Sequence, residues 1–286
     1  MVDPSLLARL ARRSLRHMAA QNRFPDILIT QMPILFGNSF PKSGTHLLTQ
    51  ILAGFTSFGA VVESGLPPVL TFEGESGRPR SLGSILADLA RLQPGDISYG
   101  HLHALPEVVE ALCRGGVAPY FIYRDPRDVV VSHIFYVTDI NNRHVHHDYY
   151  VNELKSFGQR LDVSILGRPE LDTPFPDIRA RFEPYLPWLD RSEVLALRYE
   201  DLLQDVQAQL GSIFDHAMSR GFIYRGARAA AIQSLSQRIK PAKSPTFRSG
   251  QAGSWRGHFT PRHKLLFKEI AGDLLIRLGY EQNQNW

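Results

Sequence analysis

Residues 34–52, ILFGNSFPKSGTHLLTQIL, constrain the fold of this chain more than any other stretch. The apolar run from Ile34 to Phe36 predicts a buried strand, and apolar residues at helical spacing from Leu47 to Leu52 predict a helix. The loop between them, residues 37–45, consists mostly of small residues and carries one lysine. Backbone N–H groups and the helix dipole at such a turn favour an anion, and the lysine adds a point charge. This stretch therefore predicts a phosphate-binding site.

The loop is close to the phosphate loop of nucleoside triphosphatases, G-x-x-x-x-G-K-[ST], but departs from it. Lys42 and Ser43 match the end of the pattern, but Gly37 lies one residue closer to them than the pattern requires, and Pro41 stands where the second glycine is expected. Proline has no N–H and a fixed φ, so it cannot supply the backbone donor of that position. The loop alone leaves a nucleotide or small-molecule kinase open.

Strands that alternate with helices predict an α/β fold with a mainly parallel, doubly wound sheet. After the opening unit, apolar strands are expected at residues 96–99, 117–123 and 194–199, each followed by a helical pattern. Residues 55–84, rich in Gly, Pro, Ser and Glu, are expected to form a long loop. The chain has 286 residues and is 43% hydrophobic, which suits one domain over residues 1–286.

Residues 1–23 predict an amphipathic N-terminal helix. We expect Leu6, Leu7, Leu10, Leu15 and Met18 to form one face that packs on the domain, with arginines on the other. Contact of this basic helix with an anionic membrane surface or a partner stays open.

Composition and motifs exclude several classes of protein. A net charge of +4 suits anionic small molecules, and no nucleic-acid motif is present, so we expect no nucleic-acid partner. The single cysteine, Cys113, allows no internal disulfide and no cysteine metal cluster. No apolar run reaches the length of a membrane span, so we expect no stable membrane insertion. These features predict a cytoplasmic protein.

Two later segments also carry charge where a nucleotide site would need it. Arg124 follows the apolar strand at 117–123 and can fork onto a phosphate, and Ser132, two turns into the next helix, can add a hydroxyl donor. Residues 240–258 form a loop rich in Gly, Ser and Arg that contains FRSG and GSWR.

Three motifs in this order resemble the soluble, cytosolic-type sulfotransferase family. They are P-K-S-G-T at residues 41–45, R-x-P-R-D-x-x-x-S at 124–132, and a late block similar to R-K-G-x-x-G-D-W-K at 248–256. The resemblance implies a single-domain, P-loop-kinase-like fold. It also implies 3′-phosphoadenosine-5′-phosphosulfate (PAPS) as sulfonate donor, its product PAP, no metal, and a loop at 240–258 that closes over the donor.

The family pattern assigns donor-binding roles residue by residue. Arg124 and Ser132 match the residues that bind the 3′-phosphate, and Tyr199 and Ser234 match the adenine side. Ser249 stands where the family has lysine, and Ser254 where it has an acid. The implied donor site comprises Pro41, Lys42, Ser43, Gly44, Thr45, His46, Arg124, Ser132, Tyr199, Ser234, Arg248, Ser249 and Gly250.

Sulfonate transfer needs a group that removes the proton of the acceptor, and histidine is suited to this. His101 follows a short strand between the first two motifs, where the family has its catalytic histidine; His103 and His46 are rivals. Tyr99 replaces a lysine that the family often has, which leaves charge stabilisation to Lys42. The predicted catalytic residues are His101 and Lys42, with in-line transfer to a hydroxyl or amine.

The acceptor is expected to be a small alcohol, phenol or natural product, since aromatic residues gather near the predicted site. Candidate lining residues are Phe58, Phe72, His103, Phe135, Tyr136 and Tyr149. The histidines in NNRHVHHDYY, residues 141–150, match no zinc motif, so we expect them to line a solvated or acceptor-facing loop. The oligomeric state stays open, as do a kinase and a non-enzymatic nucleotide-binding protein as alternative functions.

Overall fold

The fold is built on a parallel sheet. The computed structural model describes residues 4–74, 76–240 and 250–286. The strands run in the spatial order β2-β4-β1-β5-β6, β3 also pairs with β4, and every pairing of the described strands is parallel. This confirms the predicted single-domain α/β fold. The strands are β1 (Ile34–Ser39), β2 (Val62–Glu63), β3 (Val69–Leu70), β4 (Asp96–His101), β5 (Val117–Tyr123) and β6 (Leu195–Arg198).

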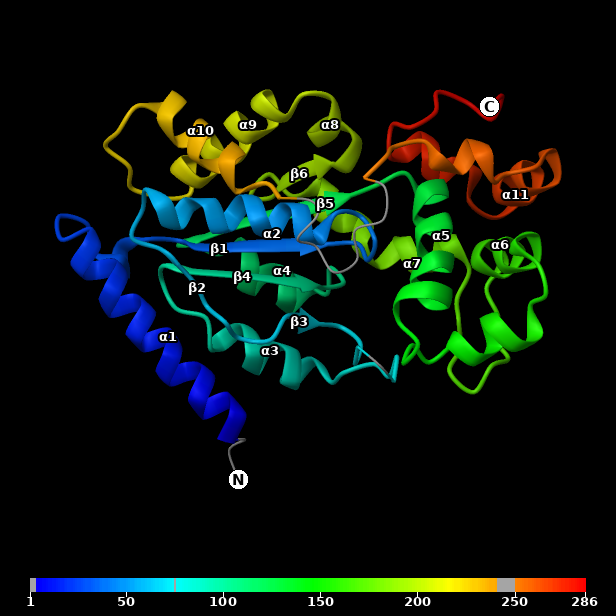
Figure 1. The fold of residues 1–286 in the computed structure, drawn as a ribbon, viewed down its shortest axis with the longest axis horizontal. Helices are drawn as coiled ribbons and strands as arrows, with labels where there is room; N and C mark the ends of the chain where they lie inside the picture. Colours follow the sequence, from blue (N-terminus) through cyan, green and yellow to red (C-terminus); the bar gives the residue numbers. More distant parts are fainter. Residues whose placement is uncertain (1–3, 75, 241–249) are drawn as a thin grey trace.

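Helices cover both faces of this sheet (Figure 1). They are α1 (Pro4–Arg23), α2 (Thr45–Gly54), α3 (Leu82–Ala90), α4 (Pro106–Cys113), α5 (Pro126–Phe135), α6 (Phe157–Leu166), α7 (Ile178–Phe182), α8 (Tyr199–Gln204), α9 (Val206–Ser219), α10 (Arg228–Arg238) and α11 (Pro261–Arg277). Because side chains alternate along a strand, Leu35 packs in the core beneath α2, α9 and α10, while Ile34 and Phe36 pack in the core that includes α3, α4 and α5.

Two segments differ from the expectation from sequence. Residues 55–84 were expected to be one long loop, but β2 and β3 lie within them and extend the sheet beside β4. The helical pattern predicted after the strand at 117–123 is α-helical only as far as Phe135. It then becomes a π-helix over Tyr136–Ile140, and a second π-helix spans Tyr149–Glu153. π-Helical turns are frequent at functional sites.

Helix α1 docks on the body with a face that matches the expected one only in part: Leu6 and Leu10 are half-buried. Arg13 is buried, and together with His17 it contacts the buried carboxylate of Asp96 at the start of β4. Leu15 and Met18, expected to pack inward, are 61% and 55% exposed. For Leu7, Leu15 and Met18 the prediction was wrong, because apolar periodicity does not reveal a buried carboxylate that attracts Arg13 and His17.

The parallel sheet brings the ends of distant segments together. The carboxyl ends of β1, β4, β5 and β6 lie at one edge, where His101 ends β4 and where residues 40–44, Arg124 and Tyr199 follow their strands. In open α/β sheets this edge is where ligands bind.

Candidate active site

The loop after β1 has a constrained backbone. The Phe40 N–H donates to the Ile122 carbonyl of β5, and the Ser43 N–H donates back to the Phe40 carbonyl. Lys42 is the only non-glycine described residue with a positive φ, at 69°. Strain of this kind persists where surrounding structure holds it, and it is concentrated at functional sites.

Gly44 begins α2 at a φ of 100°, which favours glycine. A Cβ atom at this position would lie 2.6 Å from the Cδ2 of Tyr199. The ring of Tyr199 therefore packs directly on the loop, and no larger residue fits between them.

The Lys42 ammonium lies over the ring of Tyr136, with Nζ 4.0 Å from the ring centroid. Burial and, to a lesser extent, the positive charge of Arg124 lower the pKa of Lys42 to about 8. Burial and the charge of Lys42 in turn lower the pKa of His46. The first turn of α2, Lys42 and the Arg124 segment therefore belong to one electropositive site.

Two buried polar atoms at this site have no partner among the described residues. They are the hydroxyl of Ser43, which is fully buried, and the Nε of Arg124. A buried donor without a partner is destabilising, and an anion bound at the loop would supply acceptors. The residues present therefore fit a phosphate group.

His101 is held in one tautomer at the end of β4. Its Nδ1 lies 2.9 Å from the Ser39 carbonyl oxygen and 3.0 Å from the Ser39 hydroxyl. A carbonyl only accepts, so Nδ1 carries the proton and neutral His101 bears its lone pair on Nε2. Burial lowers the pKa of His101, the Ser39 carbonyl opposes that shift, and His46 and Lys42 lower it further. These surroundings favour the neutral form of His101.

The backbone beside His101 is also fixed. The Asn38 side chain accepts from the Leu102 N–H at 2.8 Å and donates to the Leu102 carbonyl at 3.0 Å, and the Trp188 indole N–H donates to the same carbonyl. Ser39 also contacts the Thr45 hydroxyl at 2.8 Å, which links the histidine to the loop. Asn38 and Ser39 were not identified from the sequence, because a strand pattern does not reveal where its polar side chains point.

Arg124 lies where the sequence predicted, at the end of β5. Its guanidinium stacks on the Tyr199 ring at 4.7 Å and donates to the Asp128 carboxylate at 3.2 Å and to the Gln251 carbonyl at 2.7 Å. Tyr199 therefore lies between the loop at Gly44 and the arginine, which brings the first two motifs together.

Asp128, fully buried, joins the second motif to the late block. Its carboxylate accepts from the Gly253 N–H at 2.7 Å, the Ser254 hydroxyl at 2.9 Å and the Trp255 N–H at 2.8 Å. Ser254, a departure from the family pattern, is thus a donor to this carboxylate. Next to it, Arg127 lies over the rings of Trp255 and Trp286 at 4.0 and 4.5 Å.

The remaining donor-site predictions differ in what surrounds them. The Ser132 side chain, half-buried on α5, has no hydrogen bond to a described residue, so its hydroxyl can meet a ligand. The Ser234 hydroxyl donates to the Ala230 carbonyl within α10. Gly250 has a φ of 62°. Arg248 and Ser249 lie outside the described residues.

Aromatic residues extend from the loop beside His101. Phe40 contacts Tyr185 at 5.0 Å between ring centroids, Tyr185 contacts His103 at 4.8 Å, and His103 contacts Phe72 at 5.3 Å. Phe72 is 41% exposed, so this row reaches the surface. Burial lowers the pKa of His103 to about 4.

Three other aromatic candidates have different surroundings. Phe58 packs against Phe55, Phe222 and Tyr224 in the core beneath α2, on the opposite face of the sheet from Phe40. Phe135 packs against Phe157 and His258. Phe58 therefore lies away from the candidate site, whereas the role of Phe135 stays a prediction. The Tyr149 hydroxyl accepts from Arg168 Nε at 3.1 Å.

The histidines of residues 141–150 are engaged in packing and backbone contacts. His146 Nε2 contacts the Thr173 carbonyl at 2.8 Å, and His147 Nδ1 contacts the Val137 carbonyl at 2.7 Å. Burial and, to a lesser extent, the charges of His146, His147 and Lys42 lower the pKa of His144 to about 4. Across the described residues, no group of three or more His, Cys, Asp or Glu is placed to hold a metal ion.

Comparisons with known proteins agree with this geometry. Residues 120–279, more than half of the chain, match the family model described as a sulfotransferase domain. A search of curated proteins finds no match.

Solved structures share the fold at low sequence identity. A mouse sulfotransferase, SULT7A1, complexed with PAP has a TM-score of 0.58 and 19% identity, over 86% of this chain and 84% of that chain. A retinol dehydratase in a complex with retinol and PAP has a TM-score of 0.55 and 18% identity, over 86% and 83%. A retinol dehydratase in a complex with androsterone and PAP has a TM-score of 0.52 and 20% identity, over 86% of this chain and 83% of that chain.

Proposed function

We propose that this chain, which belongs to the sulfotransferase family, transfers a sulfonate group from PAPS to a hydroxyl or amine of a small-molecule acceptor, with His101 as base. The observation that carries the proposal is the hydrogen bond from His101 Nδ1 to the Ser39 carbonyl. It leaves the Nε2 lone pair available on a neutral ring, beside a loop that carries Lys42.

The donor site would combine two anion-binding parts. Lys42, Ser43, Gly44 and Thr45 would hold the 5′-phosphate, supported by the unpartnered Ser43 hydroxyl and the start of α2. Arg124 and Ser132 would hold the 3′-phosphate. The donor, when bound, supplies the sulfonate that is transferred.

Each catalytic group would act at a defined atom. His101 Nε2 would accept the proton of the acceptor hydroxyl or amine as that group attacks. Lys42 Nζ would stabilise negative charge where it develops, a role that suits a lysine in a buried site. To reach the donor it would move away from the Tyr136 ring, where it now lies.

The acceptor pocket would be partly aromatic. The row from Tyr185 through His103 to Phe72, with Tyr136 and Tyr149, would provide it, and alcohols, phenols or natural products fit such a surface. The proposal also places the reaction in the cytoplasm. The chain has one cysteine and can form no internal disulfide, which suits a reducing compartment.

The proposal is tested by incubating the protein with labelled PAPS and a panel of alcohols, phenols and amines, and by following PAP release. We expect His101→Ala and Lys42→Ala each to reduce turnover by about 10²-fold or more, with unchanged circular dichroism. Full turnover by His101→Ala would remove the base assignment. ATP consumption without PAP release would remove the donor assignment.

A further inference from the structure

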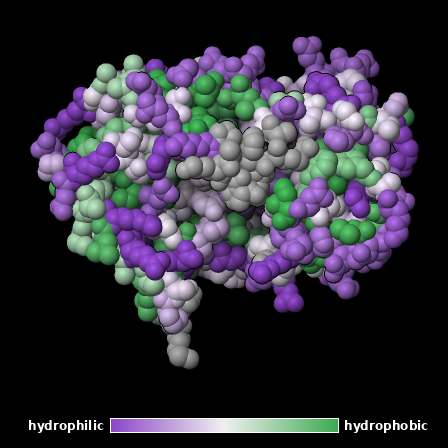
Figure 2. Space-filling view, in the orientation of Figure 1, coloured by the Kyte–Doolittle hydropathy of each residue, from purple (hydrophilic) through white to green (hydrophobic). Residues whose placement is uncertain are grey.

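The outer face of α1 is apolar and has no described neighbour. Leu7, Leu15 and Met18 are 53%, 61% and 55% exposed, and Ala11 between them is also exposed. These four residues, which we call the outer stripe, recur at spacings of four, four and three, so they lie on one side of the helix. The part of α1 that projects from the body carries hydrophobic side chains on its visible surface (Figure 2).

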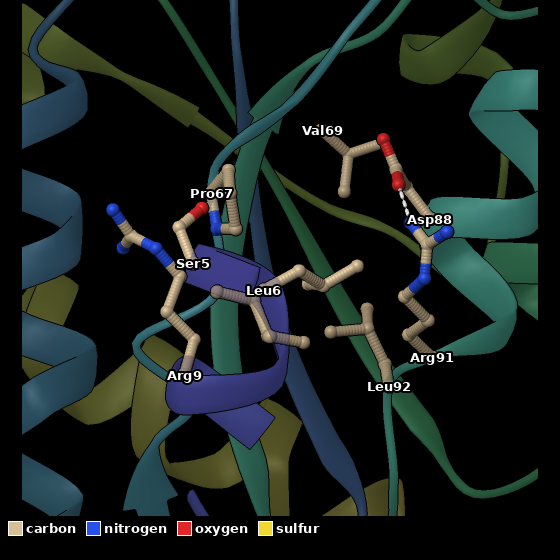
Figure 3. A pocket seen from close by; sticks show the side chains of 9 residues that line it. Ser5, Leu6, Arg9, Pro67, Val69, Asp88, Arg91 and Leu92 are labelled. Carbon is tan, nitrogen blue, oxygen red and sulfur yellow. Dashed lines mark hydrogen bonds and ion pairs between the residues drawn. The ribbon is translucent and has the colours of Figure 1, made fainter. Parts of the chain in front are cut away.

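The opposite face of α1 is fixed to the body, so the helix cannot rotate to bury the stripe. Arg13 Nη1 lies 3.3 Å from Asp96 Oδ2, and His17 Nε2 lies 2.8 Å from Asp96 Oδ1. Figure 3 shows Leu6, the neighbour of Leu7 in sequence, pointing toward Leu92 across a cavity of about 140 Å³. Turning the stripe inward would leave the buried carboxylate of Asp96 without its charged partner, which is strongly destabilising.

The helix also carries positive charge that the described residues leave uncompensated. Residues 4–23 contain five arginines and no acidic residue. Arg13 alone pairs with a carboxylate of a described residue. Three others donate to backbone carbonyls, which have no net charge: Arg9 to Gly65, Arg16 to Glu63, and Arg23 to Thr56 and Ser57.

This combination selects one kind of partner. A second copy of α1 would bring like charges together, which disfavours self-association. A nucleic acid would neutralise the arginines but leave the apolar stripe in water. An anionic bilayer surface satisfies both, since apolar side chains enter the boundary of the acyl region and arginines meet the headgroups.

We propose that α1 docks this protein on bilayer surfaces rich in anionic lipid, with Leu7, Ala11, Leu15 and Met18 inserted at the interface. The attachment is peripheral: of the helices in the described residues, none is long and apolar enough to cross a membrane. The N-terminal end of α1 projects away from the sheet (Figure 1).

The test is flotation with vesicles of phosphatidylcholine and phosphatidylserine, compared with vesicles of phosphatidylcholine alone. We expect binding to the anionic vesicles only, weakened by salt. The triple variant Leu7→Ser, Leu15→Ser, Met18→Ser should bind at least about tenfold more weakly. Arg12→Ala, in an exposed residue, should bind about fivefold more weakly. The matched control is Leu265→Ser, because Leu265 is 68% exposed but lies on α11.

Several results would overturn the proposal. Absence of wild-type flotation would do so, as would equal flotation of the triple variant and the wild type. A dimer that only the triple variant loses in light scattering, without vesicle binding, would assign the stripe to a second copy. Stripe-dependent binding to an acidic polypeptide but not to vesicles would assign it to a protein partner. If the triple variant has a lower melting temperature than the wild type, the vesicle binding of Arg12→Ala and the salt dependence of wild-type binding test the proposal instead.

The outcome is separable from the proposed reaction. None of the substituted residues belongs to the candidate active site, so the triple variant should retain wild-type turnover with a water-soluble acceptor. Loss of flotation with retained turnover supports the docking role alone.

Discussion

The Trp255 backbone N–H donates to the Asp128 carboxylate at 2.8 Å, although 127 residues separate them in sequence. The same carboxylate accepts from Gly253, Ser254 and Arg124. One buried side chain therefore orders the late block against the arginine proposed to bind the 3′-phosphate. Asp128 is best described as a positioning residue.

Asp128→Ala should weaken donor binding. Buried donors left without an acceptor destabilise by about 1–3 kcal/mol each, which favours opening of residues 250–257. We expect the KM for PAPS to rise at least about tenfold, with a smaller change in kcat, and the amides of Gly253 and Trp255 to exchange hydrogen faster. Asp128→Asn, which keeps one acceptor oxygen, should lie in between.

The control for this variant is Asp215→Ala. Asp215 also pairs with an arginine, Arg228, but both side chains are more than half exposed. Unchanged donor KM and unchanged amide exchange in Asp128→Ala would contradict the positioning role.

Gly44→Ala should disrupt the donor loop more than the backbone penalty at its positive φ would by itself. The added Cβ would meet the Tyr199 ring at 2.6 Å. Gly116→Ala is the matched control, because Gly116 also has a positive φ, 78°, but nothing lies within 4 Å of a Cβ there. Both variants carry the left-handed backbone penalty of about 1–2 kcal/mol. Only Gly44→Ala should lose PAP binding in calorimetry; equal affinities would remove the packing argument.

The pH profile should have an alkaline limb set by Lys42. The free enzyme holds this lysine at a pKa of about 8, so its charge is present below that pH and is lost above it. Because PAPS is anionic, kcat/KM for PAPS should fall above about pH 8. Lys42→Arg, whose charge persists, should lower the maximum and shift this limb to higher pH. If the alkaline limb of the kcat/KM profile stays at the same pH in Lys42→Arg, another group causes that limb.

Stability should fall as the solution is acidified. Burial lowers the pKa of His103 and of His144 to about 4, against an unfolded value of about 6.5. Between these values the unfolded chain binds more protons, so the free energy of unfolding decreases as pH falls through this window. Each histidine contributes up to about 1.4 kcal/mol per pH unit, and solvent reduces this for half-exposed side chains.

Urea unfolding at a series of pH values checks this expectation. His103→Gln and His144→Gln should each flatten the dependence between about pH 4 and 6.5. A free energy of unfolding that stays constant across the window would show that these histidines titrate alike in both states.

Short-range sequence patterns were sufficient to predict several parts of the site. The strand, loop and helix from Ile34 to Leu52 follow from apolar spacing and small residues, which act over a few positions. Arg124 could be placed after one strand and Tyr199 at the end of another, because apolar runs end there. The parallel sheet follows from the alternation of strands and helices, and its geometry alone brings these strand ends to one edge.

What the tertiary structure decided are contacts between segments far apart in sequence. The Ser39 carbonyl sets the tautomer of His101 across 62 residues, and Asp128 orders a block more than a hundred residues away. Helix α1 presents Leu7, Leu15 and Met18 to solvent, because Asp96, buried in β4, attracts Arg13 and His17. Residue spacing determines which side chains share a face of a helix or strand. Which face turns inward depends on the desolvation of charges that only meet once the chain has folded.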